Sequence, residues 1–301
     1  MSILQNTIAI VYDCDMTLTP RYMQEPLFRK YGVEERVFWA EKDEMRRRAR
    51  DQGISFDDEC AYTNLILRYV KGGKFANLSN DQLRRLGAEI ELFPGLPDFF
   101  DRVRKIPKDD ETFKAHQIIV EHYVASSGLK AMIEGSALGP HLDGIFASEF
   151  VEGKNGEIAE LARVVGFLKK TEFLYELNKG CNKDPTIDIN RLLPAELRRV
   201  PWQNMIYVGD GPTDVPCFSL VNKNGGTTFA VYAPGSLKAF GQAYSLAQQK
   251  RVLAFAPADY QEGSQISLCL EQTVRRLAER IVKAREMELE RGGSPAPKYL
   301  L

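Results

Sequence analysis

Four acidic residues that could do chemistry lie in two short motifs, each directly after an apolar run. Asp13 and Asp15 follow the run TIAIVY in the motif DCDMT. Asp210 and Asp214 follow the run MIYV in the motif GDGPTD. Alternate side chains of an extended chain point the same way, so Asp13 and Asp15 are expected on one side of a strand end. A solvated turn would explain either motif alone, whereas the two together indicate an oxygen site that suits Mg²⁺ and a phosphate.

Phosphate chemistry also needs a hydroxyl group and a fixed cation, and the chain offers both. Ser126 ends an apolar run, QIIVEHYVA, and is followed by Ser127 and Gly128. The pair Lys169 and Lys170 precedes a helical pattern that begins near Thr171. Lys170 is preferred because it comes directly before Thr171, which is expected to be the helix N-cap, but Lys169 stays open. The alternatives are a small polar turn residue for Ser126 and a solvated surface charge for the lysine.

The elements that must position these residues alternate between strands and helices. Helices are expected after Pro94-Gly95, where Pro107 would end the helix, over residues 171–178, and over residues 266–286 with an apolar stripe of period 3.6. Such alternation predicts a parallel α/β sheet covered by helices on both faces, which binds ligands at the carboxyl ends of its strands. The expected strands are residues 7–12, 117–125, 145–151, 205–208, 227–232 and 252–255.

One block of the chain interrupts this alternation. Residues 20–92 show apolar residues at helical spacing and no strand-like alternation, with breaks at Gly53 and Gly72. We therefore expect a helical domain at residues 20–92, inserted after the first strand. The α/β core would comprise residues 1–19 and 93–301.

Composition and charge narrow the classes of partner. Lys and Arg number 40 and Asp and Glu number 41, which gives no general attraction to nucleic acid or to an anionic membrane. The five cysteines form no CxxC pair, and the three histidines show no metal-site spacing. No apolar run is long enough to span a bilayer, and the N-terminus lacks the features of a signal peptide. A cytoplasmic protein with no nucleic acid or membrane partner is expected.

The ordered motifs resemble those of the haloacid dehalogenase (HAD) superfamily. DCDMT resembles the DxDxT that follows the first strand of that family, and VASSG its second motif, a strand ending in Ser or Thr. KKTEF resembles its third motif, a Lys ahead of a helix, and GDGPTD its fourth, GDxxxD. The resemblance implies a Rossmann-like core of HAD type. The insert at residues 20–92 resembles a C1-type helical cap, as in phosphoserine phosphatase-like members.

The resemblance implies a two-step mechanism for a phosphatase. Asp13 would attack phosphorus and form an aspartyl-phosphate. Asp15 would protonate the leaving oxygen and then activate a water molecule as a general base. Ser126, Lys170 and Thr17 would bind the phosphoryl group.

The cofactor that the resemblance implies is Mg²⁺. Its ligands would be the carboxylates of Asp13 and Asp210 and the backbone carbonyl of Asp15. Asp214 would support the metal either as a direct ligand or by holding the ligands in place.

The expected partner is a small phosphorylated metabolite. Phosphoserine phosphatases carry a Glu seven residues after the second Asp of the first motif, and this chain has Tyr22 there, which argues against phosphoserine. Arg21, Tyr22 and Glu25 are the candidates for substrate specificity. Two alternatives stay open: a phosphotransferase or mutase that uses the same site, and a non-catalytic binding protein on the same fold.

Overall fold

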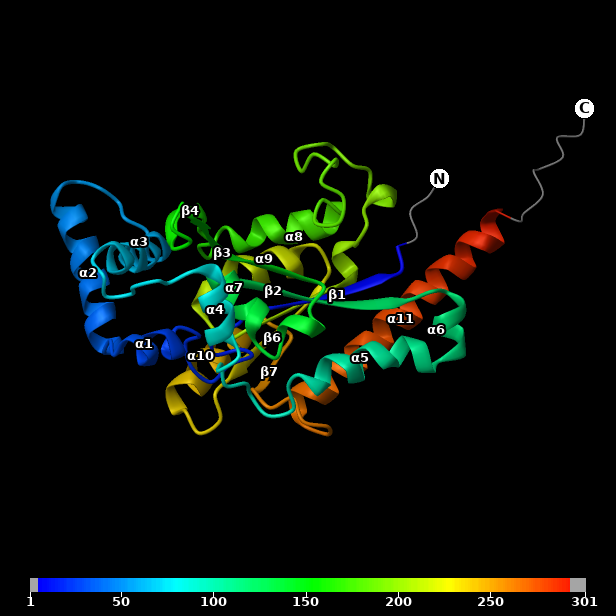
Figure 1. Cartoon of the computed structure of the whole chain (residues 1–301). Coiled ribbons are helices and arrows are strands. Elements are labelled where there is room, and N and C mark those ends of the chain that lie inside the picture. The colour runs from blue at the N-terminus through cyan, green and yellow to red at the C-terminus, as the bar shows by residue number, and fades with distance from the viewer. Residues whose placement is uncertain (1–4, 293–301) are drawn as a thin grey trace, which may run out of the picture.

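The computed structural model describes residues 5–292 and contains a central sheet of seven strands in the order β4-β3-β2-β1-β5-β6-β7 (Figure 1). Neighbouring strands are parallel, except that β3 and β4 are antiparallel. The strands are β1 Thr7–Tyr12, β2 Ile119–Leu129, β3 Gly144–Glu152, β4 Ile158–Arg163, β5 Met205–Gly209, β6 Thr227–Tyr232 and β7 Ala254–Pro257.

Strand β1 is central because its side chains are apolar on both faces. All six of its residues are buried. Ile8, Ile10 and Tyr12 pack into one apolar cluster, and Ala9 and Val11 pack into another on the opposite face. A strand with two apolar faces must lie inside a sheet that is covered on both sides. This places the residues that follow β1 at the middle of the carboxyl edge of the sheet.

Helices cover the sheet on both faces. Apolar side chains of α5, α6 and α11 pack in the first cluster, and those of α8, α9 and α10 in the second. In Figure 1, α5 and α11 lie side by side, and they contact one another. The core helices are α5 Asp98–Asp109, α6 Glu111–Ala115, α7 Lys130–Gly135, α8 Lys170–Lys179, α9 Val215–Lys223, α10 Leu237–Gln248 and α11 Gln265–Gly292. Short 3₁₀ turns lie at Gly139–His141, Ala195–Leu197, Trp202–Asn204 and Pro212–Asp214.

The segment between β1 and α5 is helical and gathers at one end of the sheet (Figure 1). Its helices are α1 Glu25–Tyr31, α2 Glu35–Asp51, α3 Asp58–Lys71 and α4 Asn80–Gly87. The fold class predicted from the sequence, a parallel α/β core with a helical cap inserted after the first strand, is therefore confirmed. The apolar cluster beside β1 continues into this cap, so the boundaries at residues 19 and 93 stay a prediction.

The β3-β4 hairpin anchors the cap to the core. The Asn80 amide donates a hydrogen bond to the Glu152 side chain (2.7 Å), and the Ile158 amide donates to the Leu78 carbonyl (2.9 Å). Strand β4 was not predicted, because its sequence IAELAR lacks a strict alternation of apolar and polar residues and only its first residue, Ile158, is buried. Its place is decided by pairing with β3 and with the cap.

Several element boundaries predicted from the sequence were wrong. Pro107 lies inside α5, which continues to Asp109. A proline close to a helix end removes only one of the last backbone hydrogen bonds, so it need not end the helix there. Helix α8 begins at Lys170 with Lys169 as its N-cap residue, so Thr171 is not the N-cap. In addition, β2 extends through Ser126 to Leu129 rather than ending at residue 125.

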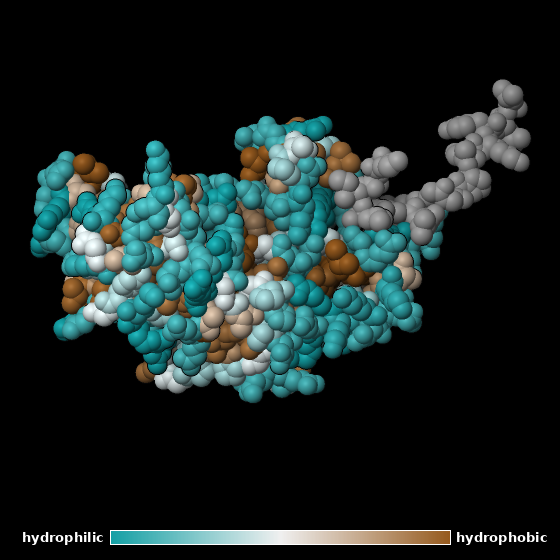
Figure 2. Space-filling view, in the orientation of Figure 1, coloured by the Kyte–Doolittle hydropathy of each residue, from teal (hydrophilic) through white to brown (hydrophobic). Residues whose placement is uncertain are grey.

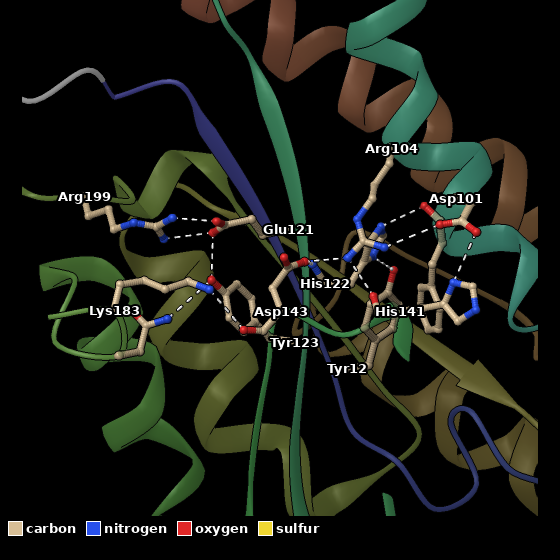
Figure 3. Close-up of polar contacts among 12 residues, drawn as sticks. Tyr12, Asp101, Arg104, Glu121, His122, Tyr123, His141, Asp143, Lys183 and Arg199 are labelled. Carbon is tan, nitrogen blue, oxygen red and sulfur yellow. Dashed lines mark hydrogen bonds and ion pairs between the residues drawn. The ribbon is translucent and has the colours of Figure 1, made fainter. Parts of the chain in front are cut away.

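A buried polar network fixes the ends of β1 and β2 against α5 (Figure 3). His122 is fully buried, and its ring nitrogens contact the Tyr12 hydroxyl (3.2 Å) and the Phe100 carbonyl (3.1 Å). Burial lowers the pKa of His122 well below its usual value. The Asp143 carboxylate accepts from the His122 amide (2.8 Å) and from Arg104 (2.6 Å). His122 is thus a structural residue held by protein groups on both sides.

No helix in the described part of the chain is long and apolar enough to cross a membrane. On the face shown in Figure 2, hydrophobic residues form small patches separated by hydrophilic ones. The apolar faces of the helices are thus directed mainly toward the sheet and the cap.

Helices α4 and α7 cross so closely that two glycines are required. A Cβ atom at Gly135 would overlap the Arg84 carbonyl oxygen, and one at Gly87 would overlap the Met132 carbonyl oxygen. Backbone atoms on both sides leave no side chain that could move away. The contact between cap and core therefore depends on these two residues.

We predict that Gly135→Ala destabilises the protein by about 1–3 kcal/mol, the usual cost of overpacking. Gly241→Ala is the matched control, because Gly241 lies in an exposed part of α10 with nothing near its Cβ position. It should stabilise the protein by about 0.5–1 kcal/mol through helix propensity. Urea unfolding followed by circular dichroism measures both changes, and equal effects of the two substitutions would contradict the close crossing.

Candidate active site

A cavity of about 610 Å³ opens at the carboxyl ends of β1, β2 and β5, beneath the cap. Its size is that of a small-molecule site. Core residues that line it include Asp13, Asp15, Met16, Ser126, Ser127, Gly128, Lys170, Asp210, Gly211, Pro212 and Thr213. The motifs that are far apart in the sequence thus meet at one place, as the carboxyl edge of a parallel sheet requires.

Lys170 joins the two acidic motifs. Its ammonium lies 2.9 Å from Asp13 Oδ1 and 3.0 Å from Asp214 Oδ1. The side chain is 1% exposed, and that of Asp214 is fully buried. The Tyr207 hydroxyl also donates to Asp214 Oδ1 (2.8 Å). Lys169, by contrast, is partly exposed and pairs with a glutamate on the surface of α8, so the structure places Lys170 and not Lys169 in the site.

The loop after β1 orients Asp13 and Asp15 separately. The Asp13 amide donates to the Val208 carbonyl of β5 (2.9 Å), which ties the start of the loop to the neighbouring strand. Asp15 Oδ1 accepts from the Met23 amide (3.0 Å) and lies 3.5 Å from the Thr19 hydroxyl. Met16 has φ of 60°, a conformation that costs energy for a residue with a Cβ. The loop is therefore held in a shape that its sequence alone does not favour.

Three carboxylates are close enough to share a cation. Oxygens of Asp13, Asp210 and Asp214 lie within 4.8 Å of one another. Carboxylate oxygens in this number suit a hard divalent ion such as Mg²⁺. Asp214 already accepts hydrogen bonds from Lys170 and Tyr207 on Oδ1. Asp13 and Asp210 are consequently the better candidates for direct ligands.

The two predicted hydroxyl residues are placed differently. Ser126 lines the cavity, is 1% exposed, and accepts a hydrogen bond from the Gly128 amide (3.0 Å). Thr17 is fully buried and is not among the residues that line the cavity. Its carbonyl accepts from Tyr260 (2.8 Å), so Thr17 supports the loop rather than facing the space where a phosphate would lie.

Burial of this many acids shifts their protonation. Burial, and then the charge of Asp13, raises the pKa of Asp15 to about 7. Burial raises the pKa of Asp210, with the charges of Asp214 and Asp13 adding to it. Burial also raises the pKa of Asp13, although Lys170 opposes the shift. For Lys170 burial would lower the pKa, but the charges of Asp13 and Asp214 outweigh it and raise the pKa.

The cap supplies the opposite wall of the cavity. Of the three residues proposed for specificity, Tyr22 lines the cavity, whereas Arg21 and Glu25 form an ion pair with one another (3.2 Å) outside it. The sequence analysis did not identify the other cap residues that line the cavity, because helical periodicity does not determine which face of a cap helix is directed toward the core. These residues are Gln24, Trp39, Lys42, Asp58, Glu59 and Tyr62.

Comparison with known proteins identifies a sequence relative that matches over most of its length and solved structures with a similar fold. No protein-family model matches the chain. An uncharacterized protein of Borreliella burgdorferi is 31% identical over 280 residues, which cover 87% of this chain and 94% of the relative. This similarity is high and extensive enough to place both chains in one family.

The solved structures share the fold at low sequence identity. A probable phosphoserine phosphatase from Vibrio cholerae has a TM-score of 0.54 at 17% identity, covering 93% of this chain and 68% of that one. A HAD-family hydrolase from Salmonella enterica serovar Typhi has a TM-score of 0.50 at 16% identity, covering 84% and 67%. The likeness extends over both the sheet and the cap.

The raised carboxyl pKa values predict how stability depends on pH. A carboxyl group whose pKa is higher in the folded state binds more protons there, so the free energy of unfolding falls as pH rises between the two pKa values. This window runs from 3.8 to about 7 for Asp15 and from 3.8 to about 8 for Asp210. The protein in EDTA should therefore lose stability between about pH 5 and pH 8.

Urea unfolding at these two pH values measures the loss, and excess Mg²⁺ should reduce it because the cation stabilises the ionised carboxylates. Asp210→Asn should flatten the pH dependence in EDTA and weaken the effect of Mg²⁺. A stability that rises steadily with pH in EDTA would contradict the raised pKa values.

Proposed function

Because the chain belongs to the same family as the Borreliella burgdorferi protein and has the fold of HAD-family hydrolases, we propose that it is a Mg²⁺-dependent phosphatase. It hydrolyses a small phosphomonoester through an aspartyl-phosphate on Asp13. The observation that carries the proposal is the convergence of Asp13, Asp210 and Asp214 around a buried Lys170, beside Asp15, at the floor of the cavity beneath the cap.

Asp13 is the nucleophile. Its Oδ1 accepts from Lys170 (2.9 Å) and from the Cys14 amide (2.8 Å), which leaves Oδ2 for the attack. A bond forms between this oxygen and phosphorus while the bond to the leaving oxygen breaks. The ammonium of Lys170 keeps the buried carboxylate ionised and offsets negative charge on the transferring group.

Asp15 transfers the proton in both steps. With a pKa of about 7, a share of the molecules carry the proton near neutral pH, as a general acid requires. The hydrogen bond from Met23 goes to Oδ1, so Oδ2 can hold the proton and give it to the leaving oxygen. The resulting carboxylate then takes a proton from the water that attacks phosphorus, releasing phosphate and restoring Asp13.

The donor set fits Mg²⁺. Asp13 and Asp210 would hold the ion through carboxylate oxygens, and Asp214 would support it from its contacts with Lys170 and Tyr207. When bound, Mg²⁺ would neutralise charge on the phosphoryl oxygens. Ser126 faces the same space and would donate its hydroxyl proton to a phosphoryl oxygen, while the cap would limit access of bulk water.

Substitution of the two aspartates of the first motif separates their roles. Asp13→Asn should abolish turnover, because the amide oxygen is a poor nucleophile. Asp15→Asn should lower kcat by about 10²–10⁴-fold for an alkyl phosphate, the usual contribution of a general acid. With an aryl phosphate, which needs little protonation to leave, Asp15→Asn should accumulate phosphorylated protein, detectable by intact-mass spectrometry. Turnover by Asp13→Asn but not by Asp15→Asn would overturn the mechanism.

Metal removal tests the cofactor. Release of inorganic phosphate from an aryl phosphate should stop in EDTA and return with Mg²⁺, and Asp210→Asn should need a higher Mg²⁺ concentration for half-maximal rate. The matched control is Asp259→Asn. Asp259 is a partly buried aspartate of the core that does not line the cavity. Full activity of the wild-type protein in EDTA would sink the proposal, and transfer of phosphate to an acceptor without release would indicate a phosphotransferase instead.

A further inference from the structure

The cap wall of the cavity would meet the leaving group of a phosphomonoester, because the phosphoryl group belongs beside Asp13 on the core side. The chemistry of this wall therefore limits which alcohol the substrate carries. Its side chains are Tyr22, Gln24, Trp39, Lys42, Asp58, Glu59 and Tyr62.

Gln24 offers an unsatisfied acceptor. Its side chain lines the cavity and is 3% exposed, and its Oε1 has no hydrogen-bond partner among residues 5–292. The preceding amide, that of Met23, donates to Asp15 Oδ1 (3.0 Å), which holds Gln24 close to the reacting carboxylates. A buried carbonyl oxygen without a partner is unfavourable. A donor on the substrate would satisfy it.

Glu59 offers a second acceptor, with a negative charge. It lies on α3, where its carboxylate is close to Gly166 of the core and interacts electrostatically with Lys170. Burial raises the pKa of this carboxyl. No ion pair joins Glu59 to another side chain in the described part of the chain, whereas Lys170 is paired with Asp13 and Asp214. The charge of Glu59 would thus be available for a cation in the cavity.

Aromatic rings complete this end of the cavity. The Trp39 ring lies 6.1 Å from that of Tyr62 and 5.8 Å from that of Tyr22, measured between ring centroids. The Tyr62 hydroxyl donates to the Ser127 carbonyl (2.5 Å), which fixes the ring across the junction of cap and core. The Lys42 ammonium already lies over the Trp39 ring, so the part that we assign to these rings is to pack against a short alkyl chain.

The one lysine on the cap wall is already compensated. The Lys42 ammonium lies 2.6 Å from Asp58 and 3.1 Å from Asp43, and over the Trp39 ring. No arginine is among the described residues that line the cavity. A carboxylate on the leaving group would therefore find no free positive charge on this wall.

We propose that the substrate is a phosphomonoester of a small amino alcohol, whose protonated primary amine donates to Gln24 Oε1 and to the Glu59 carboxylate, beside the Trp39 and Tyr62 rings. Phosphoethanolamine is the simplest compound of this class. The proposal rests on the phosphatase function proposed above. It differs from recognition of phosphoserine, since the cap wall offers a counter-charge for the amine but no uncompensated positive charge for a carboxylate; the further lysine that lines the cavity, Lys238 of α10, lies on the core side.

Phosphate release from four compounds tests the proposal: phosphoethanolamine, its neutral isostere n-propyl phosphate, the anionic phosphoglycolate, and phosphoserine. The kcat/KM for phosphoethanolamine should exceed that for n-propyl phosphate by about tenfold to a hundredfold, the value of hydrogen bonds to a charged group. Phosphoserine and phosphoglycolate should both fall below phosphoethanolamine. An equal or lower value for phosphoethanolamine, in a protein that hydrolyses n-propyl and aryl phosphates, would overturn the inference and leave the phosphatase function standing.

Substitutions on the cap wall test which residues are responsible for the preference for phosphoethanolamine. Glu59→Gln and Gln24→Leu should each reduce the ratio of kcat/KM for phosphoethanolamine over n-propyl phosphate by about tenfold. Glu41→Gln is the matched control: it removes a carboxylate from the cap at an exposed ion pair with Lys74 outside the cavity, and should leave the ratio as in the wild type. An unchanged ratio in the Glu59→Gln variant would show that Glu59 does not bind the substrate amine.

Binding measurements test the proposed amine site even if the protein hydrolyses none of these compounds. Trp39 fluorescence should change on addition of phosphoethanolamine, with a Kd about tenfold lower than for n-propyl phosphate, and the signal should be lost in Trp39→Phe. If no phosphomonoester is hydrolysed, the proposed function fails. Tighter binding of phosphoethanolamine would then still support the amine site, and equal binding would overturn it.

Discussion

The buried ammonium of Lys170 is the constraint on which the site depends. Removing an ammonium from water is unfavourable unless carboxylates surround it, and here Asp13 and Asp214 do so at 2.9 and 3.0 Å. The three residues come from different parts of the fold: Asp13 from the loop after β1, Asp214 from the turn after β5, and Lys170 from the start of α8. A helix N-terminus does not favour a lysine, so this position is held by the two carboxylates. One ionic contact thus fixes the mutual placement of three elements.

The site contains more carboxylates than the single ammonium of Lys170 can neutralise. Asp13 is buried, Asp15 and Asp210 are partly buried near it, and Lys170 alone cannot balance the three carboxylates. Burial, and then the charges of neighbouring carboxylates, raise their pKa values. A divalent cation would relieve it, which links the proposed cofactor to the stability of the folded protein as well as to phosphoryl transfer.

The cap and the catalytic loop are built as one unit. The Met23 amide that fixes Asp15 is followed directly by Gln24 on the cavity wall, and the Tyr62 hydroxyl of α3 donates a hydrogen bond to Ser127, beside Ser126, the proposed phosphate ligand. Shifts of the cap would therefore move both the proposed general acid and the proposed amine site. The glycines at the crossing of α4 and α7 and the β3-β4 hairpin restrict such shifts. Selectivity for the leaving group and the chemistry at phosphorus consequently share the same supports.

The sequence alone determined the α/β core, the helical insert and the acidic motifs, because strand and helix periodicities and the DCDMT and GDGPTD turns are local signals. The tertiary structure decided the rest. Only folding shows that Lys170 rather than Lys169 is buried, that Thr17 is not among the residues that line the cavity, and that β4 pairs at the edge of the sheet. Glu59 and Gln24 carry no local signal, since their role depends on which faces of the cap meet the core. Such contacts join residues far apart in the chain, and periodicity within one segment does not encode them.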